Sequence, residues 1–378
     1  MERLAAALAV VAVAAGCNPA ARIGVVVPES GEAAPYGASV KSGVKLALDD
    51  PRLTRLVPQG LEVMFRDSGS DPTRAASAAE ALFEGGALVV IGGVTSAEAK
   101  VMIPVADRMR RVLLSPSASA PDLAGRSPFF FRVYPSDELE GVKAADFLTL
   151  VRRARSVLVV QEDNDYTRGL LPVFVGELTS RGARVVGPVR LDERGWQAQL
   201  RDAVVRRSPD GVYVCGYGDA ILAALRLLRG LAYRGTICTT SAFNAGAVLT
   251  RAGPLAEGVF FPLASLDMRS AAEPAATFVA RYRAAYGLTP DIYAAHGYDA
   301  ALAAVYALAG VGERTGAAVA RQLRLLADRR GVMGPIAFDE YGNIKHSLRN
   351  HWIRNGRVED FDTYRDQATP RPAPGGAR

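Results

Sequence analysis

Residues Leu88–Leu123 read LVVIGGVTSAEAKVMIPVADRMRRVLLSPSASAPDL, and this stretch decides the fold of the chain. The apolar run Leu88–Ile91 is short and unbroken, which is typical of a parallel strand buried on both faces. An amphipathic segment from Ala97 to about Met109 follows, and a second strand is expected at Val112–Leu114. Both strands end in small hydroxyl residues, and open α/β sheets bind ligands at the carboxyl ends of their strands. The stretch therefore predicts a parallel sheet whose two loops hold a small molecule.

The same alternation of strand and helix continues on both sides of this stretch. A first set of strands is expected at Ile23–Val27, Leu61–Phe65 and Pro128–Val133. A helix at about Leu139–Val151 separates them from a second set, expected at Val157–Val160, Ala183–Gly187, Gly211–Val214 and Gly235–Thr239. This pattern predicts the α/β class, with two doubly wound parallel sheets.

The last third of the chain adds helices and a few more strands. Gly258–Leu263 is an apolar run with an interior proline, which predicts a strand at a sheet edge or at a crossing between domains. Gly334–Phe338 and Leu348–Ile353 predict two further strands, and Asn355-Gly356 is a hairpin turn signal. Helices are expected at Pro274–Tyr286, Ala294–Gly310 and Gly316–Ala327.

Composition excludes several classes of function. The chain has 378 residues, 49% of them hydrophobic, and this length predicts two domains. The net charge of +6 comes from basic residues that gather just before predicted strands, where they complement the C-terminal ends of helices. Without a stripe of basic and aromatic residues, nucleic-acid binding is not expected. Three cysteines and three scattered histidines do not predict a metal site. Cys215 and Cys238 are expected to be buried thiols, with a disulfide as the alternative in an exported chain.

The N-terminus has the pattern of an export signal. Its apolar run Leu4–Gly16 is too short to cross a bilayer and fits the core of a signal peptide. Small residues precede Cys17, as in bacterial lipoproteins, so residues 1–17 are expected to be a lipoprotein-type signal with lipidation at Cys17. The alternatives are an ordinary cleaved signal and an apolar helix. The expected location is the periplasm or cell envelope, on a membrane anchor. The Pro- and Gly-rich residues 368–378 are expected to be a disordered tail.

The motifs along the chain resemble the periplasmic solute-binding proteins that serve branched-chain amino acid ABC transporters, the Leu/Ile/Val-binding family. Each motif is short, but their order and spacing from Ile23 to Val358 are specific. The motifs are Gly92–Ser96 (GGVTS), Ser115–Ser119 (SPSAS), Phe131–Asp137 (FRVYPSD), Asp163–Tyr166 (DNDY), Pro209–Val212 (PDGV), Tyr298–Ala300 (YDA) and Gly342-Asn343.

This resemblance implies a type I periplasmic-binding fold, in which two lobes joined by three crossings close on a ligand. The crossings are expected near Val133–Asp137, Phe261–Leu266 and Asp339–Asn343. The first lobe is then expected to comprise residues 22–134 and 265–340, and the second lobe residues 135–264 and 341–366.

The resemblance also implies a set of ligand contacts. Thr95, Ser96, Ser117 and Ser119 match the positions that hold a ligand carboxylate in similar proteins. Elementary physics agrees, because a helix N-terminus and serine hydroxyls both donate hydrogen bonds to an anion. The alternative is that these residues merely cap helices. Tyr36 matches an aromatic cover from the first lobe, and Tyr166 and Tyr217 match tyrosines of the second lobe; the alternative is partly buried loop tyrosines.

One position departs from the family pattern. Amino acid binders of this family carry an acidic residue after the strand equivalent to Gly235–Thr239, where it pairs with the ligand ammonium; the matching residue here is Ser241. An unpaired buried ammonium loses roughly 2–5 kcal/mol of binding energy. Asp219 or Asp267 is a possible substitute. A carboxylate or amide ligand without the amine is the other interpretation, and Phe243 would suit an aromatic one.

We therefore expect an extracytoplasmic receptor that closes on a small carboxylate-bearing ligand and delivers it to an ABC permease. The alternatives are the same fold used as a sensor or envelope-regulating lipoprotein, and an enzyme on a doubly wound fold. The chain contains neither a GxSxG elbow nor a P-loop, so no catalytic residue and no cofactor are predicted.

Overall fold

The computed structural model describes residues 20–264 and 273–368. The predicted signal peptide and Cys17 lie outside the described residues, as does most of the predicted tail. Ala368, the first residue of that tail, is the last residue of helix α13 (Phe361–Ala368). None of the helices in the two described ranges is long and apolar enough to span a membrane.

The first sheet is parallel throughout and has five strands in the order β2-β1-β3-β4-β5. Its strands are β1 (Ala21–Val27), β2 (Leu61–Asp67), β3 (Val89–Ile91), β4 (Val112–Ser115) and β5 (Phe130–Arg132). The strands predicted at Leu88–Ile91 and Val112–Leu114 are thus neighbours, with Ile91 opposite Leu114. Their carboxyl ends lie side by side, as the sequence predicted.

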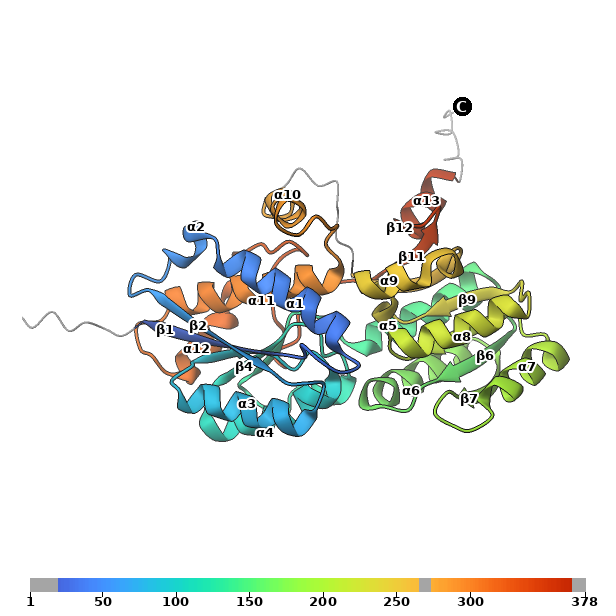
Figure 1. Cartoon of the computed structure of the whole chain (residues 1–378), viewed down its shortest axis with the longest axis horizontal. Coiled ribbons are helices and arrows are strands. Elements are labelled where there is room, and N and C mark those ends of the chain that lie inside the picture. Colours follow the sequence, from blue (N-terminus) through green and yellow to red (C-terminus); the bar gives the residue numbers. More distant parts are fainter. Residues whose placement is uncertain (1–19, 265–272, 369–378) are drawn as a thin grey trace, which may run out of the picture.

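Helices cover both faces of this sheet (Figure 1). Helices α1 (Ala34–Leu48) and α11 (Ile292–Ala309) pack on one face, while α3 (Pro72–Glu84) and α4 (Ser96–Met109) pack on the other. Alternate strand residues serve the two layers, since Val25 belongs to the core under α1 and Val26 to the core under α3 and α4. Three shorter helices complete this half: α2 (Pro51–Thr54), α10 (Ala275–Tyr286) and α12 (Gly316–Leu323).

The contact between α1 and α11 depends on two glycines. A Cβ atom on Gly43 would lie 1.9 Å from the carbonyl oxygen of Ala294, and one on Gly297 would lie 2.4 Å from that of Val40. Only a residue without a side chain allows the backbones to approach this closely. The glycines therefore set the distance between the two helices.

The second sheet has seven strands in the order β12-β11-β10-β9-β8-β6-β7. The five strands from β10 to β7 are parallel, and β11 and β12 extend the sheet as an antiparallel hairpin. The strands are β6 (Ser156–Gln161), β7 (Arg184–Arg190), β8 (Gly211–Cys215), β9 (Thr236–Thr239), β10 (Val259–Leu263), β11 (Arg349–Arg354) and β12 (Arg357–Asp360). The predicted hairpin turn is confirmed, because Asn355 and Gly356 have φ angles of 51° and 69°.

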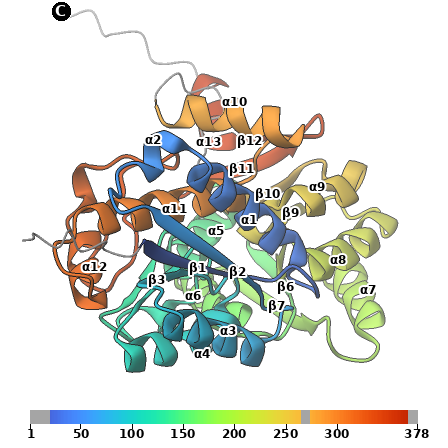
Figure 2. The same cartoon turned by 60° about the vertical axis from the view of Figure 1, so that its left-hand side comes forward.

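Helices also flank the second sheet. Helix α5 (Asp137–Asp146) continues as a π-helical turn over Phe147–Val151 and packs against α6 (Asp165–Ser180). Helices α7 (Trp196–Arg207) and α8 (Gly218–Gly230) pack against each other, and the short α9 (Gly246–Ala252) contacts α8. Figure 2 shows α10 and α13 on the same side of the molecule.

One strand prediction holds in only one of its two alternatives, and another is wrong. Strand β10 lies inside the second sheet and not at an edge, but the chain leaves this sheet at the end of β10 and continues toward α10, which agrees with the alternative of a crossing. The pairing of β10 with β9 ends at Phe260, so Pro262 removes no hydrogen bond from that ladder. The predicted strand Gly334–Phe338 is instead an irregular segment with isolated bridges, one of them between Phe338 and Ile344. Apolar residues alternate in this segment because Ile336 and Phe338 pack into the core. The alternation does not come from pairing with a neighbouring strand.

We call the part built on the first sheet lobe 1 and the part built on the second sheet lobe 2. The chain passes from β5 into α5, from β10 toward α10, and from the segment around Asn343 into β11. Arg132 of β5 anchors two of these passages, because its Nε donates to Asn343 Oδ1 at 2.7 Å and its Nη1 to the Ala120 carbonyl at 2.9 Å. The residue bounds of the lobes given above stay a prediction.

Candidate ligand-binding site

A cavity lies between the lobes where the carboxyl ends of the two sheets meet. About 340 Å³ of space between protein atoms lies among its lining residues, open solvent included, but the centre of a water molecule can occupy only about 20 Å³ of it. The two lobes therefore lie close together around this site. All eight residues that the sequence predicted as ligand contacts line it. The lining residues are Tyr36, Val94, Thr95, Ser96, Ser117, Ser119, Tyr134, Tyr166, Tyr217, Ser241, Ala242 and Tyr293. Their contact with a ligand stays a prediction.

The N-terminus of α4 forms one wall of the cavity. Thr95 caps this helix by accepting a hydrogen bond from the Glu98 N–H at 3.2 Å. The buried Glu98 carboxylate accepts from the N–H groups of Val94 and Thr95 and from the Ser68 hydroxyl. Burial raises the pKa of Glu98, while these hydrogen bonds oppose the shift. Glu98 thereby fixes the loop that precedes α4. The other N–H groups at the start of this helix have no acceptor within the helix.

The three serines on this wall have different hydrogen bonds. The Ser96 oxygen accepts from the Ala120 N–H at 3.2 Å, so its proton remains available to a ligand. The Ser117 hydroxyl donates to the Val94 carbonyl at 2.6 Å, which leaves only its oxygen lone pairs for a ligand. Ser119 interacts with Asp137 twice, because its backbone carbonyl accepts from the Asp137 N–H and its side chain hydrogen-bonds the Asp137 carboxyl group. Of the three serines, Ser96 is therefore the best placed to donate to a ligand carboxylate.

Five tyrosines form a continuous chain of ring contacts around the cavity. Their ring centroids are 6.4 Å apart for Tyr134 and Tyr293, 4.9 Å for Tyr293 and Tyr36, 5.5 Å for Tyr36 and Tyr217, and 5.3 Å for Tyr217 and Tyr166. The sequence predicted Tyr36, Tyr166 and Tyr217 here, whereas the structure adds Tyr134 and Tyr293. The rings give the cavity flat apolar walls with polar ends.

The most important residue that the sequence did not single out is Glu140 of α5. Its Oε1 accepts from the Ser241 N–H at 2.8 Å and from the Tyr166 hydroxyl at 3.3 Å, and its Oε2 accepts from the Ser241 hydroxyl at 2.6 Å. Burial raises the pKa of Glu140 to about 7, against the opposing effect of these hydrogen bonds. Glu140 lies three residues after the Phe131–Asp137 motif, and an acidic residue on the buried face of a helix was the available signal.

A second buried carboxyl group lies one turn earlier in the same helix. Burial and the neighbouring Glu140 raise the pKa of Asp137, while Ser119 and Arg132 act to lower it. Arg132 is itself fully buried. Two acidic groups and one guanidinium thus lie behind the residues that line the cavity, and none of the three lines it.

Tyr36 connects the two lobes across the cavity. Its hydroxyl, from α1 in lobe 1, accepts from the Gly218 N–H at 2.7 Å and donates to the Ala242 carbonyl at 3.3 Å, both in lobe 2. On another side, the Asp291 carboxylate accepts from the Gly246 N–H at 2.8 Å, which joins α11 to α9. These contacts hold the cleft closed.

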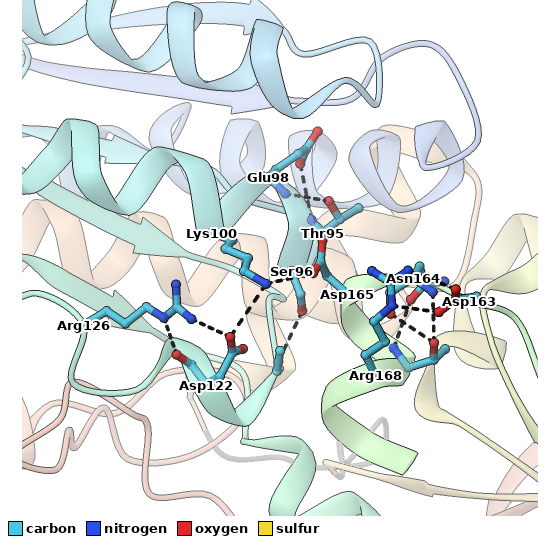
Figure 3. Close-up of polar contacts among 12 residues, drawn as sticks. Thr95, Ser96, Glu98, Lys100, Asp122, Arg126, Asp163, Asn164, Asp165 and Arg168 are labelled. Carbon is cyan, nitrogen blue, oxygen red and sulfur yellow. Dashed lines mark hydrogen bonds and ion pairs between the residues drawn. The ribbon is translucent and has the colours of Figure 1, made fainter. Parts of the chain in front are cut away.

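An ion pair also links the lobes near the α4 wall (Figure 3). Lys100 Nζ lies 2.9 Å from Asp165 Oδ1 at the start of α6, and 3.9 Å from Asp122 Oδ2 in lobe 1. The side chains of Lys100 and Asp165 are about a third exposed, at 39% and 31%. Such pairs contribute little energy in water.

The chemistry of the lining suits binding. Within residues 20–264 and 273–368, no cluster of histidine, cysteine, aspartate and glutamate has the arrangement of a metal site. Cys215 and Cys238 are free buried thiols, not a disulfide. Asp219, one of the proposed substitutes for the ammonium partner, pairs with Arg251 instead and does not line the cavity. Asp267 lies outside the described residues.

Comparison with known proteins agrees with this geometry. Residues 20–352 match the family of periplasmic binding proteins. The chain is 28% identical over 222 residues to the Leu/Ile/Val-binding protein BraC3 of Rhizobium johnstonii, a match that covers 57% of this chain and less than two thirds, 59%, of that protein. It is 22% identical over 353 residues to a leucine-, isoleucine-, valine-, threonine- and alanine-binding protein of Pseudomonas aeruginosa, covering 92% of this chain and 93% of that one.

Solved structures share the fold. The leucine-binding protein LivK of Thermotoga maritima matches with a TM-score of 0.84 and 27% identity, over 90% of this chain and 97% of that chain. A solute-binding protein of R. palustris in complex with benzoate matches with a TM-score of 0.81 and 21% identity, over 90% and 95%. Fold and family are those of substrate-binding receptors. The chain belongs to the periplasmic binding protein family.

Proposed function

We propose that this protein is a receptor that closes on a small carboxylate-bearing molecule and delivers it to an ABC permease. The observation that carries the proposal is the wall formed by the α4 N-terminus, where Ser96 and Ser119 face the cavity. Hydrogen bonds that involve a charged group contribute about 1.5–3 kcal/mol each, so a few donors are enough to hold a carboxylate without an arginine. The two lobes, with the bounds predicted from the sequence, close around the ligand by a hinge motion.

The delivery step follows from the same proposal. A ligand held between two lobes favours the closed arrangement, and a permease that binds the closed form then distinguishes loaded from empty receptor. Lipidation at Cys17 would keep the receptor close to that permease, since the several acyl chains of a lipoprotein give stable anchoring.

Thermal-shift screening followed by calorimetry tests the proposal. Amino acids, aliphatic acids, aromatic acids and the matching amides are compared, and we expect carboxylates to raise the melting temperature more than their amides. Ser96→Ala removes one charge-assisted hydrogen bond and is expected to weaken binding about 10- to 150-fold.

The control for this variant is Ser42→Ala. The Ser42 hydroxyl donates to the Ala38 carbonyl within α1, away from the cavity, so this change should leave affinity unaltered. If no carboxylate in the panel binds, or if both serine variants bind equally well, the proposed receptor function is wrong.

A further inference from the structure

The hydrogen bonds around Glu140 determine which way two hydroxyl protons point. An ionised carboxylate accepts hydrogen bonds and donates none. Because Glu140 lies within 2.6 Å of the Ser241 Oγ and 3.3 Å of the Tyr166 hydroxyl, both hydroxyl protons are directed toward it. The oxygen atoms of Ser241 and Tyr166 then present only lone pairs to the cavity that they line.

The opposite wall has the reverse character. The Ser96 oxygen already accepts a hydrogen bond from the Ala120 N–H, so its proton points away from that group and is free to be donated. The two walls belong to different lobes. A molecule that spans the cavity therefore meets the Ser96 hydroxyl as a hydrogen-bond donor from lobe 1 and the Ser241 and Tyr166 oxygens as acceptors from lobe 2.

Glu140 is built to act through Ser241 and does not reach the cavity itself. Its side chain is 1% exposed and is absent from the cavity lining. The Ser241 N–H, which is always a donor, fixes the orientation of the carboxylate through a 2.8 Å hydrogen bond. A serine oxygen has two lone pairs, so even with the Tyr134 hydroxyl nearby one remains for a ligand.

We propose that Glu140 determines ligand selectivity: by drawing the protons of Ser241 and Tyr166, it selects carboxylates that also carry a hydrogen-bond donor. An ammonium and a phenolic hydroxyl are two donor groups that meet this requirement. In the family pattern an acidic residue occupies the place of Ser241. Here the acidic group comes from a different helix, and Glu140 acts as a positioning residue that orients Ser241. This inference rests on the proposed function.

The test compares pairs of probes that differ by the donor group alone. One pair is L-leucine and 4-methylpentanoate, and the other is 4-hydroxybenzoate and benzoate. Calorimetry in alkaline buffer, where Glu140 is ionised, should show at least a tenfold preference for the donor-bearing member of the pair that fits the cavity. The pair that shows the preference identifies the donor as an ammonium or as a hydroxyl.

Glu140→Gln reverses the hydrogen bonds while keeping the shape. The amide oxygen must face the Ser241 N–H, so the amide NH₂ takes the place of Oε2 and donates to the Ser241 oxygen. The Ser241 proton is then released into the cavity, and we expect the preference to disappear or turn toward the member without the donor. Loss of packing alone would weaken both members equally. Ser241→Ala, which keeps the backbone contact, should abolish the preference even if Glu140→Gln does not fold.

Asp299→Asn is the matched control. Asp299 is another buried acid whose pKa burial raises to about 7, but it accepts from the N–H groups of Val332 and Met333, away from the cavity. Its substitution should leave the preference unchanged. If carboxylates bind without a donor preference, or if Glu140→Gln and Ser241→Ala retain it, the selectivity role of Glu140 is wrong while the receptor function stands. If none of the four probes binds but another carboxylate of the wider panel does, the selectivity inference fails while the receptor function stands. If no carboxylate of the wider panel binds, both fail.

Discussion

At the scale of single residues, the Tyr36 hydroxyl joins the two lobes. Tyr36→Phe keeps the ring contacts with Tyr217 and Tyr293 but removes both hydrogen bonds to lobe 2. A buried N–H that loses its partner costs about 1–3 kcal/mol, so we expect ligand affinity to fall roughly 5- to 150-fold. Calorimetry measures the affinity, and small-angle scattering measures how compact the liganded protein is.

Tyr286→Phe is the control for this change. The Tyr286 hydroxyl donates to the Ser42 carbonyl within lobe 1. Its loss should lower stability slightly without altering affinity. An equal effect of both variants on affinity would show that Tyr36 does not act on closure.

Glu140 should also make stability depend on pH. Burial raises its pKa from 4.5 to about 7, so between these values the folded protein binds more protons at this site than the unfolded chain. Stability from this group is therefore complete below about pH 4.5 and is lost as the pH rises through about 7. In Glu140→Gln this loss disappears. Melting temperatures measured from pH 4 to pH 8 should show the difference between variant and wild type changing over this window.

Glu138→Gln provides the comparison on the same helix, because Glu138 is exposed. Its melting curve should run parallel to that of the wild type at every pH. A parallel curve for Glu140→Gln as well would contradict the raised pKa of Glu140.

At the scale of elements, the contact between α1 and α11 has almost no spare room. In Gly43→Ala the new Cβ would meet the Ala294 carbonyl, so the helices must move apart. Overpacking of this kind destabilises a core by about 1–3 kcal/mol. Thermal denaturation should show a clear drop in melting temperature.

Gly176→Ala in α6 is the matched control. No atom lies within 4 Å of a Cβ added at Gly176, so the change should be neutral or stabilising by up to about 1 kcal/mol, because alanine restricts the unfolded chain. If Gly43→Ala behaves like Gly176→Ala, the close approach of α1 and α11 is not as tight as described.

Most elements of the two parallel sheets follow from local patterns. Runs such as Leu88–Ile91 and Val157–Val160 are buried on both faces. A strand buried on both faces needs consecutive apolar residues, so it can be recognised in the sequence. Strand β10 was harder, because its place in the sheet depends on β11, which lies far along the chain. The prediction of a strand at residues 334–338 was wrong because burial alone produced the apolar pattern. Its apolar residues are buried, but no strand pairs with the segment over its length.

For the site, the sequence identified positions better than partners. Hydroxyl residues after strands pointed to one wall, and the resemblance to the Leu/Ile/Val-binding family implied the tyrosines and Ser241; all eight residues line the cavity. The contact between Glu140 and Ser241 joins residues 101 positions apart, and no local spacing predicts it. The role of Tyr134 and Tyr293 depends likewise on how the lobes come together.

At the scale of the whole molecule, the ion pair between Lys100 and Asp165 crosses the cleft. Both side chains are partly exposed, so the pair should contribute only about 0.2–1 kcal/mol to closure. Lys100→Gln is expected to weaken binding less than roughly sixfold, and the effect should shrink as salt is added. Calorimetry at low and high ionic strength checks this.

Arg108→Gln is the control, because Arg108 pairs with Glu80 inside lobe 1. Its substitution should leave affinity unchanged at both salt concentrations. A large, salt-independent effect of Lys100→Gln would instead indicate that this lysine touches the ligand.

The two hydrogen bonds of Tyr36 have a consequence for timing. A molecule held between the lobes can leave only after the hydroxyl has released both Gly218 and Ala242. Its residence time is then set by the opening of the protein and not by diffusion out of the cavity. Weak and strong ligands would therefore differ mainly in how long the lobes stay together, which is the interval available for meeting a transporter.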